Sequence, residues 1–233
     1  MISFVVPAYN EERYLGPTLA AIHEAALASG EPYEIVVADD GSTDGTAALA
    51  QSRGARVVAV RNRQIAATRN AGARASSGEV LFFVDADTRV DAALVAEALA
   101  ALRGGAVGGG APVRLDAAPG WARAFMRFVF VPCYFRIARW AAGCFVFCTR
   151  AAFEAAGGFD ERYYASEEIH LSRALKRQGR FAMLGHFVTS SSRKLEGRSA
   201  ADVVWMVARL AAAGRAGLRR RTGATAFWYP ERR

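Results

Sequence analysis

The chain of 233 residues is 52% hydrophobic and carries a formal net charge of +8, with a pI of about 9.9. Its length fits one large α/β domain or two small ones. Its apolar content is high enough to build a hydrophobic core, which excludes a disordered polar chain. Of its 30 basic residues, only Lys176 and Lys194 are lysines. Arginine matches phosphate geometry, so nucleotide phosphates, nucleic acid and anionic lipid headgroups are all compatible partners.

Cysteine usage and hydropathy favour a cytoplasmic protein. The three cysteines, Cys133, Cys144 and Cys148, are an odd number without C-x-x-C spacing, as expected for reduced thiols. The N-terminus begins with a strand-like segment and lacks a basic leader region, so we expect no signal peptide. No uninterrupted apolar run reaches the roughly 18–20 residues that a membrane-spanning helix needs.

The first part of the chain alternates predicted strands and helices. Strands are predicted at 3–7, 33–38, 56–60 and 80–84, and helices at 11–29, 43–53, 65–76 and 91–102. Such alternation is typical of a mostly parallel sheet with helices on both faces. Ligands bind these sheets at the carboxyl ends of the strands. Polar clusters follow three of the strands, at 9–12, 39–40 and 85–87, so we expect them to meet at one rim.

The second part of the chain is less regular. Five glycines lie between Gly104 and Gly110, but no Lys-Ser/Thr follows them as in a P-loop, and we predict a loop and the start of an edge strand. A helix is predicted at 166–178, with Ser166 as its N-cap and acidic residues in its first turn. The other predicted elements are strands at 144–148, 181–184 and 187–189 and helices at 150–156 and 201–218, the last followed by a basic tail.

Asp85 and Asp87 directly follow the predicted buried strand Val80–Val84. Residues two apart on a strand point the same way, so the two carboxylates repel each other unless a positive charge lies between them. A divalent cation that carries a diphosphate is one solution, because Mg²⁺ and Mn²⁺ prefer hard oxygen ligands. The alternative is a strand end with an Asx-turn at either residue.

Several motifs occur in an order that resembles the family 2 glycosyltransferases, which have the GT-A fold. They are Val5-Val-Pro-Ala-Tyr-Asn-Glu-Glu12, Val37-Ala-Asp-Asp-Gly-Ser-Thr-Asp-Gly-Thr46, Arg69-Asn-Ala-Gly72 with Ser77-Gly-Glu79, Phe83-Val-Asp-Ala-Asp87, Gly157-Gly-Phe-Asp-Glu161 and Ser166-Glu-Glu168. The resemblance implies an α/β, Rossmann-like mixed sheet, mostly parallel and flanked by helices. It also implies one domain over 1–200, with a nucleotide-sugar half (1–103) and an acceptor half (104–200), before a C-terminal apolar helix and tail (201–233).

The resemblance implies a donor site at the strand ends. We expect Pro7, Tyr9 and Glu11 to contact the nucleoside, and Asp40 to accept a hydrogen bond from the base or ribose. Asp39 is then the residue that shapes the turn before Gly41. Two arginines are candidates to face the diphosphate, Arg69 and, more weakly, Arg63; for Arg69 a role on the helix surface is the alternative.

The resemblance also implies a metal site for Mg²⁺ or Mn²⁺. Asp87 is expected to bind the metal through its carboxylate, and Asp85 to hold the ribose or a metal-bound water. His186 can complete the metal site, although a lone histidine is more often structural. Arg193 and Lys194 follow a serine run and can clamp the pyrophosphate, with a solvated loop as the alternative.

The catalytic base is expected at Glu168, where the family has aspartate in a Glu-Asp pair. This chain has Glu-Glu, which lengthens the reach by one methylene, and Glu167 is the fallback. Alternatively, two glutamates at the start of a helix can have no role beyond a favourable interaction with the helix dipole. Gly158 and Phe159 resemble the loop beneath the acceptor, with close backbone approach at the glycine and an apolar floor from the phenylalanine; the alternative is a plain turn.

The function implied is a metal-dependent, inverting transfer of sugar from a nucleotide-diphosphate sugar to a polysaccharide, lipid or polyprenyl phosphate acceptor. A retaining transferase on the same fold is the first alternative. A sugar-phosphate nucleotidyltransferase usually has a Gly-rich basic loop where this chain has Ala8-Tyr-Asn-Glu-Glu12, which argues against it. Only the net charge supports a nucleic-acid-binding module, so no nucleic acid partner is expected.

Two apolar, arginine-interrupted segments, Trp121–Trp140 and Val203–Leu218, leave a further question open. Such segments can lie in a membrane interface with their arginines at the headgroups. They can equally pack on the core or form a homodimer contact. Peripheral contact with the inner face of the cytoplasmic membrane is therefore one expectation among three.

Overall fold

The computed structural model describes residues 1–195, 199, 201–202, 205, 209 and 218–219. Most of the helix predicted over 201–218, and the basic tail after it, lie outside these described residues. Within them, no helix is both long and apolar enough to cross a membrane.

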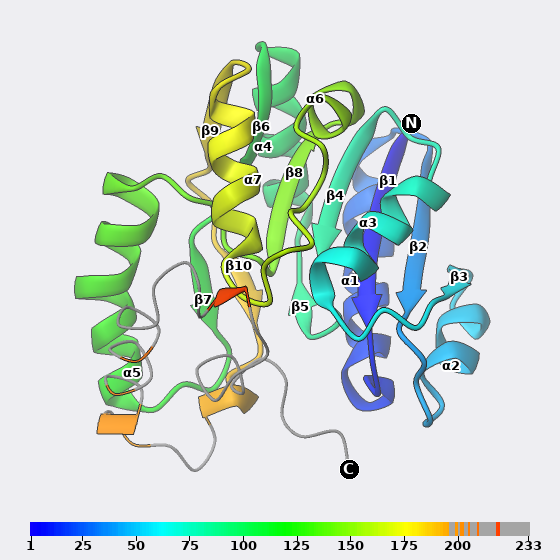
Figure 1. The fold of residues 1–233 in the computed structure, drawn as a ribbon, viewed down its shortest axis with the longest axis horizontal. Coiled ribbons are helices and arrows are strands. Elements are labelled where there is room, and N and C mark those ends of the chain that lie inside the picture. Colours follow the sequence, from blue (N-terminus) through cyan, green and yellow to red (C-terminus); the bar gives the residue numbers. More distant parts are fainter. Residues whose placement is uncertain (196–198, 200, 203–204, 206–208, 210–217, 220–233) are drawn as a thin grey trace.

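A seven-stranded sheet forms the centre of the described part of the chain (Figure 1). Every strand in it runs parallel to its neighbours except β8, which is antiparallel to both β4 and β6. The order across the sheet is β3 (Arg56–Ala59), β2 (Tyr33–Asp39), β1 (Ile2–Ala8), β4 (Val80–Val84), β8 (Phe145–Thr149), β6 (Ala106–Gly110) and β9 (Arg180–Met183). The predicted mixed, mostly parallel α/β architecture is therefore confirmed.

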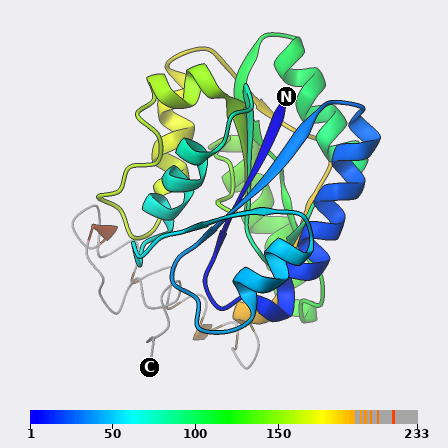
Figure 2. The ribbon, with the colours of Figure 1, turned by 90° about the vertical axis from the view of Figure 1, so that its right-hand side faces the viewer.

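Helices cover both faces of this sheet (Figure 2). They are α1 (Glu12–Ser29), α2 (Thr46–Ser52), α3 (Ile65–Ala75), α4 (Ala92–Arg103), α6 (Arg150–Ala155) and α7 (Glu167–Lys176). A smaller three-stranded sheet of β5 (Thr88–Arg89), β10 (Val188–Ser190) and β7 (Val113–Leu115) lies beyond the carboxyl end of β4. Strands from both predicted halves, 1–103 and 104–200, share the central sheet.

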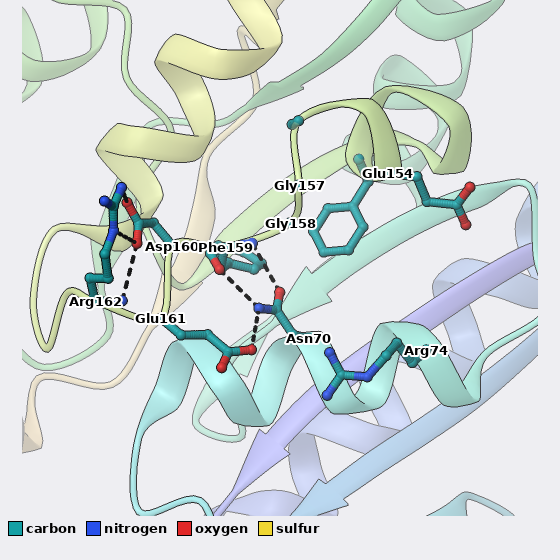
Figure 3. A pocket seen from close by; sticks show the side chains of 11 residues that line it. Asn70, Arg74, Glu154, Gly157, Gly158, Phe159, Asp160, Glu161 and Arg162 are labelled. Carbon is teal, nitrogen blue, oxygen red and sulfur yellow. Dashed lines mark hydrogen bonds and ion pairs between the residues drawn. The ribbon is translucent and has the colours of Figure 1, made fainter.

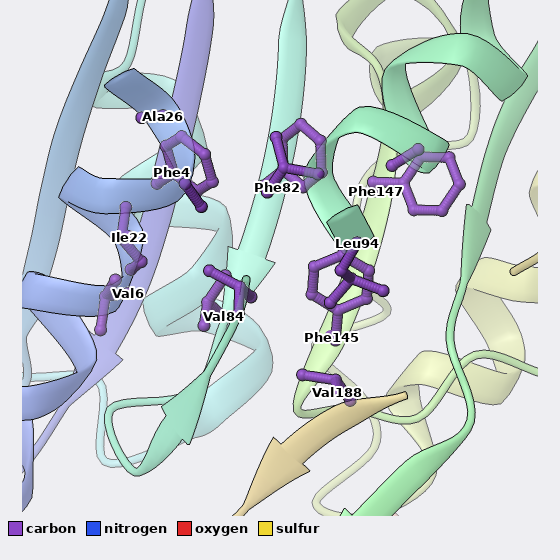
Figure 4. Close-up of a cluster of buried hydrophobic side chains, with 14 of the residues drawn as sticks. Phe4, Val6, Ile22, Ala26, Phe82, Val84, Leu94, Phe145, Phe147 and Val188 are labelled. Atoms are coloured by element: carbon purple, nitrogen blue, oxygen red, sulfur yellow. The ribbon is translucent and has the colours of Figure 1, made fainter. Parts of the chain in front are cut away.

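The alternation of side chains along the strands divides the core into two layers. Phe4 and Phe82 point to one face, where they stack at 5.1 Å between ring centroids and pack with α1 and α4 (Figure 4). Val5 and Phe83 point to the opposite face and pack against α3, α6 and α7. Both faces of the central strands are apolar because both are covered, as expected for a parallel sheet.

One local prediction is wrong, and a second, the N-cap position of Ser166, is right although the Ser166 side chain makes no capping hydrogen bond. The glycine-rich strand β6 is not an edge strand, since it lies between β8 and β9. Its glycines permit that position, because a Cβ on Gly109 would meet the Ala182 carbonyl oxygen and the Phe147 ring. Ser166 precedes α7 but does not cap it with its side chain, because it takes a left-handed backbone conformation with φ of 67°.

The aromatic segment predicted as one apolar stretch forms two successive helical pieces. The first is α5 (Gly120–Phe125), and it continues into the π-helix η1 (Met126–Ile137). Pro132 lies inside η1 and has no N–H to donate, which is compatible with a departure from regular α-helical hydrogen bonding. One side of η1 buries Val131 and Phe135 against the core.

Candidate functional site

The carboxyl ends of β1, β2 and β4 meet at one edge of the sheet (Figure 1). The register pairs Ala8 of β1 with Asp39 of β2, so the two polar loops leave side by side. Asn10 ties them together: its Oδ1 accepts from the Thr43 N–H at 2.8 Å, and its own N–H donates to the Ser42 hydroxyl at 2.9 Å. The predicted convergence of these strand ends on one rim is confirmed.

Arg69 of α3 connects the strand edge to the start of α7. Its Nη2 donates to Asp85 Oδ1 at 2.7 Å, and its Nη1 donates to Glu167 Oε1 at 2.6 Å. The same Nη2 also donates to the Gly143 carbonyl at 2.7 Å. One guanidinium therefore holds a carboxylate of the D-x-D pair and a carboxylate of the Glu-Glu pair, although these motifs lie far apart in the sequence.

Because the Arg69 guanidinium is buried, its charge needs partners of opposite charge. The Arg69 side chain is 1% exposed, and its Nε has no hydrogen-bond partner among the described residues. The carboxylates of Asp85 and Glu167 raise the pKa of Arg69 despite its burial, so the guanidinium stays charged. The ring of Phe159 lies 5.2 Å from its central carbon. The alternative role of Arg69 on the helix surface is wrong.

A second arginine holds the other member of the D-x-D pair. Arg193, in the short 3₁₀ helix η2 (Arg193–Leu195), donates from Nε to Asp87 Oδ2 at 2.8 Å. Its Nη1 and Nη2 donate to the Glu11 carboxylate at 2.8 and 2.6 Å, and its guanidinium lies over the Tyr14 ring. Burial raises the pKa of Glu11 despite Arg193. Asp85 and Asp87 thus each face a guanidinium of opposite charge, which offsets the repulsion between the two carboxylates.

Glu168 lies beside this network at the first turn of α7. Burial and then the neighbouring Glu167 raise its pKa to about 8, against the opposing effect of Arg69. The hydroxyl of Tyr134 in η1 lies 3.0 Å from Glu168 Oε1. Glu167 is committed to Arg69, whereas Glu168 is only partly covered, so Glu168 is the carboxylate of the pair better placed to exchange a proton.

Tyr134 is the site residue that sequence reasoning missed. It belongs to the segment Trp121–Trp140, for which the sequence predicts only membrane, core or dimer contact. Nothing in its local sequence distinguishes it from the other aromatics of that segment. Its position next to Glu168 arises only when η1 packs beside α7.

The residues predicted to bind the nucleoside lie along the rim with different degrees of access. Pro7 is buried within β1 opposite Ala38. Tyr9 is partly buried at the end of that strand. Asp40 is buried and accepts from the Arg63 N–H at 2.9 Å. Their contacts with a nucleotide stay predictions.

Asp39 shapes the turn after β2, as predicted. Its Oδ1 accepts from both the backbone N–H and the hydroxyl of Ser42. Gly41 lies inside this turn with φ of 74°, a conformation that favours glycine.

The predicted acceptor loop packs against α3 (Figure 3). The Asn70 amide accepts from the Phe159 N–H and donates to the Phe159 carbonyl, both at 2.9 Å. A Cβ on Gly158, which has φ of 73°, would lie 2.8 Å from Asn70 Oδ1. The predicted close approach at Gly158 is therefore real, but it is made to Asn70.

Phe159 is 1% exposed and lies beneath Arg69, so it is an apolar floor for the guanidinium rather than a surface that a ligand touches. This corrects the expectation of direct acceptor contact. A hollow of about 760 Å³ opens beside this loop. Its lining includes Asn70, Arg74, Glu154, Gly157, Glu161 and Arg162.

His186 does not join the Asp pair. Its Nδ1 lies 2.8 Å from Glu97 Oε2 of α4, and its backbone N–H also donates to that carboxylate. Within the described ranges, no group of three or more His, Cys, Asp or Glu side chains could by itself hold a metal ion. The expectation that His186 completes a metal site is therefore wrong. Lys194 follows Arg193 in η2, and its side chain lies outside the described residues.

Comparison with known proteins identifies the family of the chain. The family model for "Glycosyl transferase family 2" matches residues 3–156. An undecaprenyl-phosphate 4-deoxy-4-formamido-L-arabinose transferase of Pseudomonas aeruginosa is 40% identical over 94 residues, which are 37% of this chain and 28% of that protein. Validoxylamine A glucosyltransferase of Streptomyces hygroscopicus subsp. limoneus is 35% identical over 110 residues, 45% of this chain and 24% of that protein.

Solved structures share the fold at low identity. TarS 1–349 of S. aureus superposes with a TM-score of 0.65 at 20% identity, covering 83% of this chain and 61% of that one. The mannosyltransferase PcManGT of Pyrobaculum calidifontis, solved with GDP-Man and Mn²⁺, gives 0.64 at 20% identity, covering 90% and 60%. The fold is therefore GT-A, as predicted.

The family model covers more than half of the chain, so the chain belongs to glycosyl transferase family 2. Its enzyme class is accordingly that of a glycosyltransferase. The matched region is only about a quarter of the length of the curated relatives, 28% and 24% in the two cases above.

Replacing Arg69 with methionine tests the central interaction. The change leaves the buried Glu167 and the half-buried Asp85 without their cation, so we expect the free energy of unfolding to fall by about 3–5 kcal/mol. Urea denaturation measures the difference. Arg162→Met is the matched control, because Arg162 forms an exposed pair with Asp160 and its loss should leave stability nearly unchanged. Equal stability of the Arg69→Met and wild-type proteins would contradict the proposed role.

Proposed function

We propose that the chain transfers a sugar from a nucleotide-diphosphate sugar to an acceptor hydroxyl or phosphate, with inversion at the anomeric carbon and with the help of Mg²⁺ or Mn²⁺. The observation that carries this proposal is the Arg69 bridge, which holds Asp85 of the D-x-D pair and the Glu-Glu turn of α7 at one strand edge. The residues proposed to bind the donor and the proposed catalytic base thereby lie in one site. The 1–103 half supplies the donor site and the 104–200 half the acceptor side.

The donor set at β4 fits a divalent cation. Asp85 and Asp87 offer hard carboxylate oxygens, and Mg²⁺ is commonly held by one or two carboxylates together with substrate phosphates. A bound cation would supply Lewis-acid stabilisation of the charge that develops on the leaving nucleoside diphosphate.

We propose that Arg193 and Lys194 clamp the diphosphate. Arg193 bridges Asp87 and Glu11. A diphosphate offers guanidinium a stronger bidentate partner than the strand-end carboxylates. We infer that Arg193 turns to the diphosphate when donor enters, and that Pro7, Tyr9, Glu11 and Asp40 face the nucleoside.

Glu168 is the proposed base. It takes the proton from the acceptor hydroxyl while that oxygen attacks the anomeric carbon and the carbon–oxygen bond to the diphosphate breaks. A raised pKa suits this task, since a general base works best when its pKa lies near the working pH. Glu167 is less suited to this role because its carboxylate is buried and paired with Arg69.

Nucleotide binding tests the donor site. We expect one of UDP, GDP, CDP or dTDP to raise the melting temperature only when Mn²⁺ or Mg²⁺ is present, and a ligand at about 100 Kd adds ~2.7 kcal/mol. Asp87→Asn should abolish this shift because it removes a metal ligand. Asp160→Asn is the matched control in the exposed pair with Arg162. Shifts that survive Asp87→Asn would rule out the proposed metal site.

Acceptor turnover tests the base. Glu168→Gln should lower kcat by about 10²–10⁴, the usual contribution of a positioned general base, while the nucleotide-dependent thermal shift stays intact. Glu154→Gln on α6 is the exposed control. If Glu167→Gln abolishes turnover and Glu168→Gln does not, the assignment is reversed. The anomeric configuration of the product distinguishes inversion from retention.

A lipid-linked acceptor and peripheral contact with the cytoplasmic membrane face complete the proposal. The outer face of α5 and η1 exposes Phe128 (71%), Val129 (47%) and Ile137 (78%). A groove of about 870 Å³ lies beside Phe128, between β7 and the α5–η1 segment, and its lining includes Arg114, Arg123, Arg127 and Arg136 with Asp116 as the one acidic residue. Exposed apolar side chains among arginines suit an anionic bilayer surface. The P. aeruginosa relative is by name an undecaprenyl-phosphate transferase.

Vesicle flotation tests this surface. The protein should float with phosphatidylglycerol vesicles and not with phosphatidylcholine vesicles. Phe128→Ser combined with Ile137→Ser should weaken binding at least about tenfold, since burying each such side chain contributes ~1.5–3 kcal/mol. Leu27→Ser is the control, because Leu27 on α1 is 70% exposed. If the double variant instead abolishes a homodimer in sedimentation, the face is a dimer contact and the membrane proposal is wrong.

A further inference from the structure

The hydroxyl of Tyr134 lies between two acceptors. It is 3.0 Å from Glu168 Oε1 and 3.2 Å from the Ala141 carbonyl oxygen. A tyrosine hydroxyl has a single proton, so it donates to one of them at a time and can accept with its oxygen. Which of the two oxygens accepts the Tyr134 proton must depend on whether Glu168 is ionised.

We propose that Tyr134 is a positioning residue that holds Glu168 in both of its protonation states. Before proton transfer its hydroxyl donates to the Glu168 carboxylate. After transfer, the new carboxylic acid donates to the Tyr134 oxygen, and the hydroxyl proton turns to the Ala141 carbonyl. The tyrosine keeps its proton throughout, so the only proton that moves between molecules is the one from the acceptor. This inference rests on Glu168 being the base of the proposed function.

The surroundings of Tyr134 support this role. Its ring is fixed by Phe130, stacked at 4.9 Å between centroids, and by Trp140 in an edge contact at 5.5 Å. The Ala141 N–H donates to the Ser172 hydroxyl of α7 at 3.1 Å, which ties the residue that offers the second acceptor to α7. The hydroxyl position is therefore set by packing on η1 and α7, independently of its hydrogen bond to Glu168.

The charged groups around the pair keep the tyrosine protonated. Burial, and then the Glu168 charge, raise the pKa of Tyr134 well above its usual value. Other groups facing the pair are Glu167 on α7, Arg69 on α3 and Cys144 just before β8. Asp85, at the end of β4, reaches the pair only through Arg69. None of these groups can replace Tyr134 as a neutral donor to Glu168 Oε1 and acceptor from it.

Tyr134→Phe removes the hydroxyl and keeps the ring. A charge-assisted hydrogen bond is roughly twice as strong as a neutral one, so the change costs the Glu168 carboxylate more than its acid form. We expect the pKa of Glu168 to rise by about half to one unit. The ¹³C resonance of the Glu168 side-chain carboxyl, assigned by its absence in Glu168→Gln, reports this titration in the full-length protein without any substrate.

Tyr33→Phe is the matched control. Tyr33 is also hydrogen-bonded through its hydroxyl, to His23 Nδ1 at 2.8 Å, but lies on β2 away from α7. It should leave the Glu168 titration where it is. An unchanged titration in Tyr134→Phe, with folding verified by its melting curve, overturns the proposal, and so does an equal shift in Tyr33→Phe.

The pH dependence of turnover provides the second readout. With the donor identified by thermal shift, the acid limb of kcat/KM in Tyr134→Phe should move to higher pH by the same amount as the Glu168 titration. A uniform loss at every pH, without a shift, indicates a merely structural role and overturns the proposal. If Glu168→Gln keeps full turnover while the titration still shifts, the base assignment of the proposed function fails and the Tyr134–Glu168 contact itself stands.

Discussion

The buried guanidinium of Arg69 is the interaction on which the rest of the site depends. It is fully enclosed, and it stays charged because Asp85 and Glu167 lie 2.7 and 2.6 Å from it. Each carboxylate in turn depends on that cation, since an unpaired charge at this depth costs several kcal/mol. The end of β4, the helix α3 and the start of α7 are therefore fixed relative to one another by one side chain, with Phe159 as its apolar support.

The Arg69 bridge gives different partners to the four acidic residues of the D-x-D and Glu-Glu pairs. Asp85 and Glu167 serve Arg69, whereas Asp87 faces Arg193 and Glu168 faces Tyr134. Asp87 and Glu168 thus have partners that can be exchanged for a ligand or a proton. Arg69 holds Asp85 in place beside Asp87, so that the pair can face a cation while Glu168 stays available for proton transfer, which is the arrangement that the proposed transfer requires.

The α5–η1 segment has two faces with different tasks. Its inner face places Tyr134 next to Glu168, and its outer face exposes Phe128 and Ile137 among arginines. If the outer face lies on an anionic bilayer, as proposed, the lipid surface and the proposed base Glu168 are separated by the width of one helix. An acceptor with an apolar anchor would then reach the site from the side where Tyr134 lies.

The sequence by itself determined the elements of this protein. Hydrophobic alternation and turn residues are local, so they predicted most of the strands and helices of the central sheet, the rim at their carboxyl ends, the Asp39 turn and the family resemblance. Tertiary structure alone decided the interior place of β6, the pairing of His186 with Glu97, and the contacts of Arg69, Arg193 and Tyr134. Arg193 and Glu11 are 182 positions apart. Such pairs depend on how helices pack over the sheet, and local pattern carries no information about that distance.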